Sequence, residues 1–187
     1  PQTDNDLVLK VMPRGKMRIE FIKTQILEAL NDARHANRGE DLMIAVLKLT
    51  RNPEADDSKG IRSSYEEVLA CLEGISADLG IPYYDLVPNK NRREVPTVGA
   101  IRLVTLQGVR GISASHVMVF DLDQLEKWSH RTGGTIKPPI VNLGYINLSR
   151  SRASTIVMLE GEEDSEIENF LLETFTHATS LALKAQK

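Results

Sequence analysis

The stretch AIRLVTLQGVRGISASHVMVFDL, from Ala100 to Leu122, decides the fold of this chain. It holds two short runs, 101–106 and 116–120, that are rich in β-branched residues and apolar on both faces. Strands of this kind are typical of a parallel sheet that is covered on both sides. The loop between them carries two glycines and an arginine, a combination suited to phosphate binding. Since ligands bind where the strands of a parallel sheet give way to loops, the stretch predicts a binding loop in an α/β domain.

The rest of the chain alternates between strand-like and helix-like segments. Strands are expected at Leu7–Met12, Asp41–Thr50, Ile81–Val87 and Ser154–Leu159. Helices are expected from Lys16 to about Asn37, from Ser64 to Leu79, over a short segment within Asp121–Arg131, and from about Ile167 to Leu181. Ser64 and Glu67 have the spacing of a capping box. This alternation predicts one domain over residues 1–187, a mostly parallel sheet with helices on both faces.

Composition narrows the class of protein. A net charge of −3 and a pI of about 5.9 argue against a generally basic nucleic-acid-binding surface, although a local basic groove remains compatible with them. The single cysteine, Cys71, cannot form an internal disulfide and is expected to be a buried thiol. No apolar run approaches the roughly 20 residues of a membrane span, and no signal peptide opens the chain. We therefore expect a cytoplasmic protein, and the start at Pro1 suggests a fragment of a larger one.

A second stretch, GYINLSRSRASTIVML from Gly144 to Leu159, places two arginines just before a strand. Together the two stretches resemble motifs V and VI of UvrD/Rep-type superfamily 1 helicases. The segment TLQGVRGISA at 105–114 is similar to the motif V pattern Thr-Leu-His-x-x-Lys-Gly-Leu-Glu-Phe. The segment YINLSRS at 145–151 is similar to the motif VI pattern Tyr-Val-Ala-Leu-Thr-Arg-Ala. GIPY at 80–83 also resembles the segment that returns to the sheet before motif V in that family.

The resemblance implies the second, C-terminal RecA-like domain of a helicase, a half of the P-loop NTPase type that lacks the P-loop. Arg150 matches the motif VI arginine that neutralises the γ-phosphate as an arginine finger. The contacts to ATP implied by the resemblance are Arg14, from a weak match to motif IV, with Arg110, Gly111, Ser113 and Arg150. The contacts implied to single-stranded DNA (or RNA) are Thr105 and Gln107, to which the basic loop adds Arg92 and Arg93.

The chain departs from the family pattern at three positions of the first stretch. Gln107 replaces the histidine and Arg110 replaces the lysine, and both keep the capacity to form hydrogen bonds. Ser113 replaces a glutamate that contacts the nucleotide, so the charge is lost there. The chain is also too short for the large inserted subdomain of the UvrD/Rep relatives.

Two absences limit what this chain could do alone. It has no G-x-x-x-x-G-K-[ST] phosphate loop and no acidic Mg²⁺ motif after a strand. No metal site is expected within it. The resemblance then implies that ATP and Mg²⁺ are held mainly by an N-terminal RecA-like domain, that the two halves share a cleft, and that this half is inactive by itself.

Two alternatives remain open. The chain could be a non-hydrolytic RecA-like module that binds nucleic acid or a protein partner, which the neutral Ser113 favours. It could also be an unrelated doubly wound α/β enzyme in which Gly108 and Gly111 cradle a phosphorylated ligand. Trp128 and His130 are candidates for base stacking, with packing of Trp128 as the other interpretation.

Overall fold

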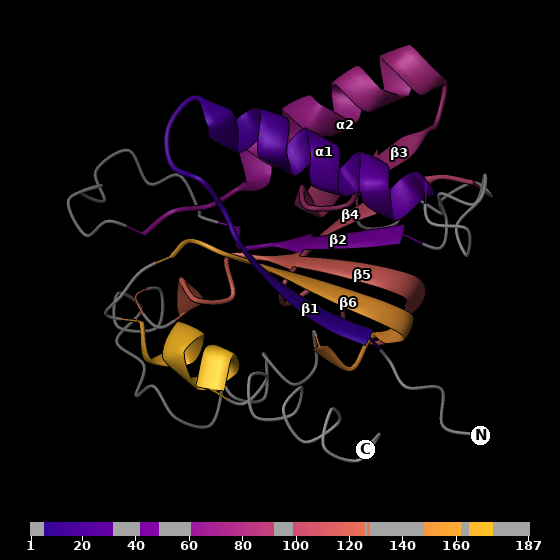
Figure 1. The fold of residues 1–187 in the computed structure, drawn as a ribbon. Helices are drawn as coiled ribbons and strands as arrows, with labels where there is room; N and C mark the ends of the chain where they lie inside the picture. Colours follow the sequence, from indigo (N-terminus) through magenta and orange to yellow (C-terminus); the bar gives the residue numbers. More distant parts are fainter. Residues whose placement is uncertain are drawn as a thin grey trace, which may run out of the picture.

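The centre of the fold is one parallel sheet (Figure 1). The structure, a computed structural model, describes residues 6–31, 42–48, 61–91, 99–125, 127, 148–161 and 165–173. Six strands pair in the order β1-β6-β5-β2-β4-β3, and all of these pairings are parallel. They are β1 (Asp6–Val11), β2 (Leu42–Val46), β3 (Tyr83–Asp85), β4 (Ile101–Thr105), β5 (Ala114–Phe120) and β6 (Ser151–Leu159). The predicted parallel α/β class is therefore confirmed.

Helices cover both faces of this sheet. On one face lie α1 (Met17–Asn31) and α2 (Tyr65–Leu79), whose apolar residues pack on Met118 and Phe120 of β5. On the other face, Val117 and Val119 of β5 pack in a cluster with Leu171, which belongs to the helical residues 166–173. Successive residues of a strand point to opposite faces, so the apolar run in β5 supplies both cores.

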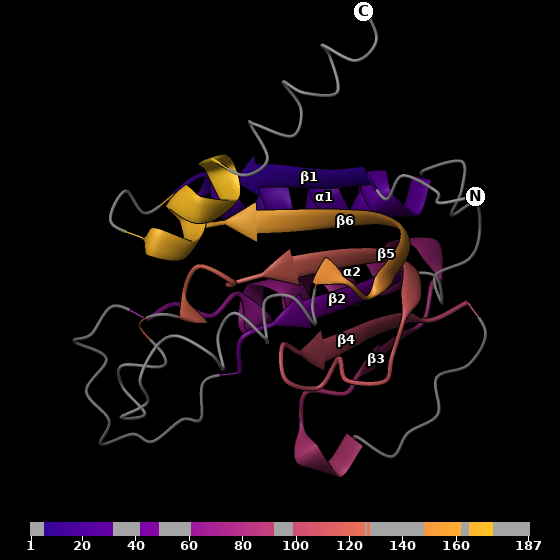
Figure 2. The same ribbon diagram turned by 90° about the horizontal axis from the view of Figure 1, so that it is seen from below.

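Because all the strands run in the same direction, their carboxyl ends lie along one side of the sheet and their amino ends along the opposite side (Figure 2). We call the edge where the strands end the carboxyl edge, and the opposite one the amino edge. β2 leads into α2 on one face, whereas β5 leads into residues that pack on the other face. Since β2 and β5 are neighbours, their carboxyl ends form the topological switch point, the usual ligand site of such folds. The connection 106–113 runs from the carboxyl edge back to the amino edge, where β5 begins.

Some local expectations are corrected and others are confirmed. Ser64 makes no side-chain cap, so the predicted capping box is wrong, because Ser64 and Glu67 bind other partners described below. The short helix expected within Asp121–Arg131 appears at Leu125 and Lys127, after a bend and turn over 121–124 in which Asp121 has a φ of 60°. Gly80 ends α2 as a left-handed cap, with φ 67°. Cys71 is a buried free thiol, as expected.

Other expectations lie beyond the described residues. The first expected helix can be followed only to Asn31 and the last only over 166–173. Trp128 and His130 also lie outside the described residues. In the part of the chain that is described, no helix has the length and hydropathy that crossing a bilayer requires.

Candidate functional site

The two segments that resemble motifs V and VI meet at the amino edge, where the structure describes the second of them over 148–151. The backbone N–H of Ala114 donates to the carbonyl of Arg150 over 3.2 Å. Next to this bond, Nη2 of Arg102 donates to the carbonyl of Ser113 over 3.1 Å. Ser113 is exposed and Arg150 is half-buried. An exposed hydroxyl beside a guanidinium group can bind a phosphate or a sugar hydroxyl, so this is our candidate nucleotide site.

The other end of the same loop is built around Thr105, at the carboxyl edge. Thr105 is only 3% exposed, and its hydroxyl accepts a hydrogen bond of 2.8 Å from the N–H of Gly108. The Gly108 N–H also lies 2.8 Å from the carbonyl of Thr105. A Cβ at position 108 would lie 2.8 Å from the Thr105 hydroxyl, so glycine is required there for steric reasons. The Thr105 hydroxyl therefore stabilises the turn that ends at Gly108. Gln107 lies within this turn and is half-buried.

Arg110 and Gly111 lie further along the loop, and both are exposed. Gly111 has a φ of 78°, which an L-residue adopts only with strain. Ile112 separates these two residues from Ser113 on the approach to the amino edge. Arg92 and Arg93 fall outside the described residues.

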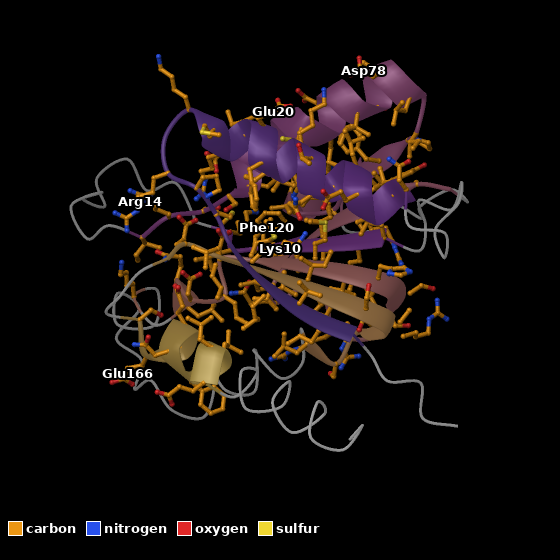
Figure 3. The ribbon with its side chains drawn as sticks, viewed as in Figure 1. Lys10, Arg14, Glu20, Asp78, Phe120 and Glu166 are labelled. Carbon is orange, nitrogen blue, oxygen red and sulfur yellow. The ribbon has the colours of Figure 1, made fainter. Side chains whose placement is uncertain are left out.

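Arg14 lies apart from the other candidate ATP-binding residues. Its Nη2 donates to the carbonyl of Gly161 over 3.2 Å, just past the carboxyl end of β6 (Figure 3). Arg150 immediately precedes β6, which is nine residues long. At about 3.3 Å per residue, the backbones at the two ends of β6 are roughly 25 Å apart. The structure thus brings Ser113 and Arg150 together and leaves Arg14 at the opposite edge.

Sequence reasoning missed a buried ion-pair network at the carboxyl edge. Arg18, near the start of α1, donates to both oxygens of Glu160, which follows β6, at 2.7 and 2.5 Å. It also donates to Glu67 of α2 over 2.6 Å and to the hydroxyl of Ser64 over 2.9 Å. Burial alone would lower the pKa of Arg18, but the hydrogen bonds to Glu160 and Glu67 raise it above its ordinary value. This charged group thus joins α1, α2 and the end of β6.

Asp121 occupies the topological switch point. Its carboxylate accepts from the backbone N–H groups of Leu47 and Ser64 at 3.0 Å, and from the Ser64 hydroxyl at 2.6 Å. Amides at the start of a helix are a common site for a bound anion, and here the chain's own carboxylate takes that place. Burial raises the pKa of Asp121 to about 6, although these hydrogen bonds act in the other direction.

Asp123 lies two residues further on and is 1% exposed. One oxygen accepts from the backbone N–H of Glu160 over 3.0 Å, and the other has no hydrogen-bond partner among the described residues. Burial, with the charges of Glu160 and Asp121, raises the pKa of Asp123 to about 7, although the hydrogen bond from the Glu160 N–H acts in the other direction. The sequence signal for this cluster is the segment FDLD at 120–123. It puts two acids just after a buried strand, so the statement that no acidic motif follows a strand is corrected, although both acids accept backbone amides.

The network does not form a metal centre of the usual kind. Within the described ranges, no group of three or more His, Cys, Asp or Glu side chains could hold a metal ion. The two acids after β5 accept hydrogen bonds from backbone amides, and Glu160 forms an ion pair with Arg18.

Comparison with known proteins adds little to this picture. No family model matches the sequence, and no curated protein matches it. A solved structure of the C-terminal domain of a possible DNA helicase from Lactobacillus plantarum WCFS1 is similar, with a TM-score of 0.45 and 14% identity. The alignment covers 84% of this chain and 74% of that chain. Similarity at this level carries no weight for function, so the proposal below depends on the residues of this chain.

Proposed function

We propose that this chain is the second core domain of an ATP-dependent superfamily 1 DNA helicase or translocase. In this proposal Arg150 is the arginine finger, and the Arg110–Ser113 segment contacts the nucleotide. ATP and Mg²⁺ are held mainly by an N-terminal RecA-like domain that carries the phosphate loop. Gln107, Arg92 and Arg93 contact single-stranded DNA, whereas the buried Thr105, expected to contact it, holds the turn beside Gln107 through its hydroxyl.

The observation that supports the proposal is the hydrogen bond between Ala114 and Arg150 at the amino edge. It joins the end of the motif V-like segment to the motif VI-like segment, as a shared nucleotide site requires. An arginine finger acts from a second domain because it must reach the γ-phosphate only when the cleft closes. Arg150 is half-buried at the sheet edge, a position from which its guanidinium group could meet a neighbouring domain.

The enzyme alternative, with a phosphorylated ligand at the carboxyl edge, has less support. Its natural site is the switch point between β2 and β5, where the Asp121 carboxylate already accepts the amides that would bind a phosphate. A phosphate entering there would meet Asp121, Asp123 and Glu160, all of them acids. Repulsion by like charges disfavours that site. The amino edge, with Arg102 and Arg150, is better suited to an anion.

The non-hydrolytic module remains the second candidate, because of Ser113. This residue is exposed and neutral where the resembled family has a glutamate that contacts the nucleotide. A module of this kind would bind single-stranded nucleic acid or a partner without turnover. The two candidates therefore differ in hydrolysis rather than in binding.

The proposal predicts that the gene encodes a longer protein, and that protein provides the test. If the upstream sequence carries a phosphate loop, the purified protein should hydrolyse ATP, and single-stranded DNA should stimulate the rate. This chain alone should show neither activity. A longer protein that has the phosphate loop and binds DNA without any turnover would favour the non-hydrolytic module. An upstream sequence without a phosphate loop would contradict the helicase proposal.

A further inference from the structure

We propose that the unpaired side of β1 is a docking surface for a second copy of this chain. In the proposed dimer the two β1 strands pair antiparallel about a two-fold axis between the two Val8 residues, so that the two sheets become one. Each copy contributes the same segment, Asp6–Val11. This inference goes beyond the proposed function and does not depend on the role of Arg150.

The first argument is that β1 has the apolar pattern of an interior strand. β1 is the outermost strand of the sheet, and among the described residues it pairs only with β6 (Figure 2). Its centre is nevertheless the uninterrupted apolar run Leu7–Val8–Leu9, which is typical of strands inside a parallel sheet. Val8 remains 41% exposed, and Leu7 and Leu9 are only half-buried. Outermost strands of natural proteins usually avoid such a run, because it invites pairing with another chain.

The second argument is the direction of the backbone groups of β1. The N–H of Met12, just after β1, donates to the carbonyl of Leu159 in β6 over 2.8 Å. The even-numbered residues of β1 therefore direct their N–H and C=O groups toward β6, and the odd-numbered residues Leu7 and Leu9 direct theirs away from the sheet. In an antiparallel pair with Leu7 opposite Leu9 of the second copy, these outward groups exchange hydrogen bonds in both directions.

The third argument is that this register is self-complementary in charge. With Leu7 opposite Leu9, Val8 stands opposite Val8 of the second copy, and position 6 stands opposite position 10. The sequence has an aspartate at position 6 and a lysine at position 10, so an acid faces a base at two symmetric places. Opposite charges at facing positions stabilise an antiparallel pair. A two-fold interface of this kind is the commonest way in which identical chains associate.

Both faces of the strand take part in the proposed pairing. The Lys10 ammonium donates to two acceptors in α1, one of them Glu28, so Val8 also lies on the α1 face of the sheet. Leu7 and Leu9 pack in the cluster on the opposite face. Pairing thus covers Val8 with Val8 of the second copy on one face and joins leucines on the other. An ammonium group has three donors, which leaves Lys10 one for a carboxylate of the second copy.

Cysteine cross-linking of the complete chain, with the buried Cys71 changed to alanine, tests the pairing. In Val8→Cys the two new cysteines would face each other at a pair without backbone hydrogen bonds. Their Cα atoms would be about 4.5 Å apart, which a disulfide can span. Mild oxidation should therefore give a covalent dimer. Val11→Cys is the matched control, because Val11 is also an exposed valine of β1 but would lie about 20 Å from its copy and should not cross-link.

Sedimentation equilibrium tests the register through its charges. The wild type should show a reversible equilibrium between monomer and dimer. Asp6→Lys should weaken the dimer on the order of tenfold, because two facing pairs of opposite charge become two pairs of like charge. Asp78→Lys makes the same change in net charge at an exposed acid of α2 and should leave the association unchanged.

A wild type that sediments as a monomer up to the highest concentration at which it stays in solution would overturn the proposal. Equal cross-linking of Val8→Cys and Val11→Cys would overturn it as well. Equal weakening of the dimer by Asp6→Lys and Asp78→Lys would contradict the register. If Val8→Cys does not fold, the sedimentation of the wild type and of these two charge variants decides the matter.

Discussion

Ala114 and Arg150 share a backbone hydrogen bond of 3.2 Å at the amino edge of the sheet. Ala114 opens β5 and pairs in register with Ser151, the first residue of β6. Because Ser113 directly precedes the donor Ala114, the bond places the backbone of Ser113 close to that of the acceptor Arg150. Two segments that are far apart in the sequence thus meet at the amino edge, and the proposed function depends on this meeting.

The turn at Thr105–Gly108 should not tolerate a side chain at position 108. In Gly108→Ala the new Cβ would lie 2.8 Å from the Thr105 hydroxyl and 3.3 Å from its carbonyl oxygen. We expect a loss of about 1–3 kcal/mol in the free energy of unfolding, measured by urea denaturation. The second change Thr105→Ala should restore part of this loss.

Gly111→Ala serves as the comparison for that experiment. Gly111 has a φ of 78°, and a Cβ at this position would have no other atom within 4 Å. We therefore expect the free energy of unfolding to fall only by the backbone strain, about 1–2 kcal/mol. Thr105→Ala should not relieve this strain. Equal rescue of both alanine variants would show that the Thr105 contact is not the cause.

The buried pair of Arg18 and Glu160 should be strongly coupled. The Glu160 side chain is 1% exposed, and Arg18→Met would leave its charge buried without its main partner. We expect a loss of about 3–5 kcal/mol in the free energy of unfolding. The double variant Arg18→Met/Glu160→Gln should lose much less than the sum of the single changes. Additive losses in a double-mutant cycle would mean that the two residues act independently.

Much of the fold could be predicted from the pattern of apolar residues in the strands. The runs at 101–106 and 116–120 are apolar on both faces because β4 and β5 are both interior strands of a parallel sheet, and periodicity captures this. The capping-box prediction failed at Ser64 because a tertiary partner, Asp121, competes for its hydroxyl. Spacing along the chain cannot reveal such a partner.

The candidate site could be predicted only in part. The motif resemblance singled out Ser113 and Arg150, which do lie side by side, but it also grouped Arg14 with them. Which edge of the sheet a residue reaches depends on whether it precedes or follows its strand, and Arg14 follows β1 whereas Arg150 precedes β6. The network around Arg18 was missed because its members come from four separate segments.

The basic loop offers a test of nucleic-acid binding. If Arg92 and Arg93 contact phosphates, changing both to alanine should weaken the affinity for a single-stranded oligonucleotide about equally for all sequences. It should also reduce the slope of log K against log salt by about 1.4, since each contact on a single strand contributes about 0.7. Fluorescence anisotropy at several salt concentrations measures both quantities.

Lys23→Ala is the control, because Lys23 lies in the middle of α1 and pairs with Asp78 of α2, away from the ends of the strands. It should leave the slope unchanged. An unchanged slope in the double variant would remove Arg92 and Arg93 from the binding surface.

The rate of DNA-stimulated ATP hydrolysis by Arg150→Ala, in the longer protein that carries the phosphate-loop domain, tests the central claim most directly. We expect kcat to fall by about 10³-fold or more while nucleotide affinity changes only a few-fold, because a finger acts on transition-state charge. Arg152→Ala, an exposed arginine two positions further on in β6, should keep nearly full turnover. Unaltered turnover in Arg150→Ala would contradict the account.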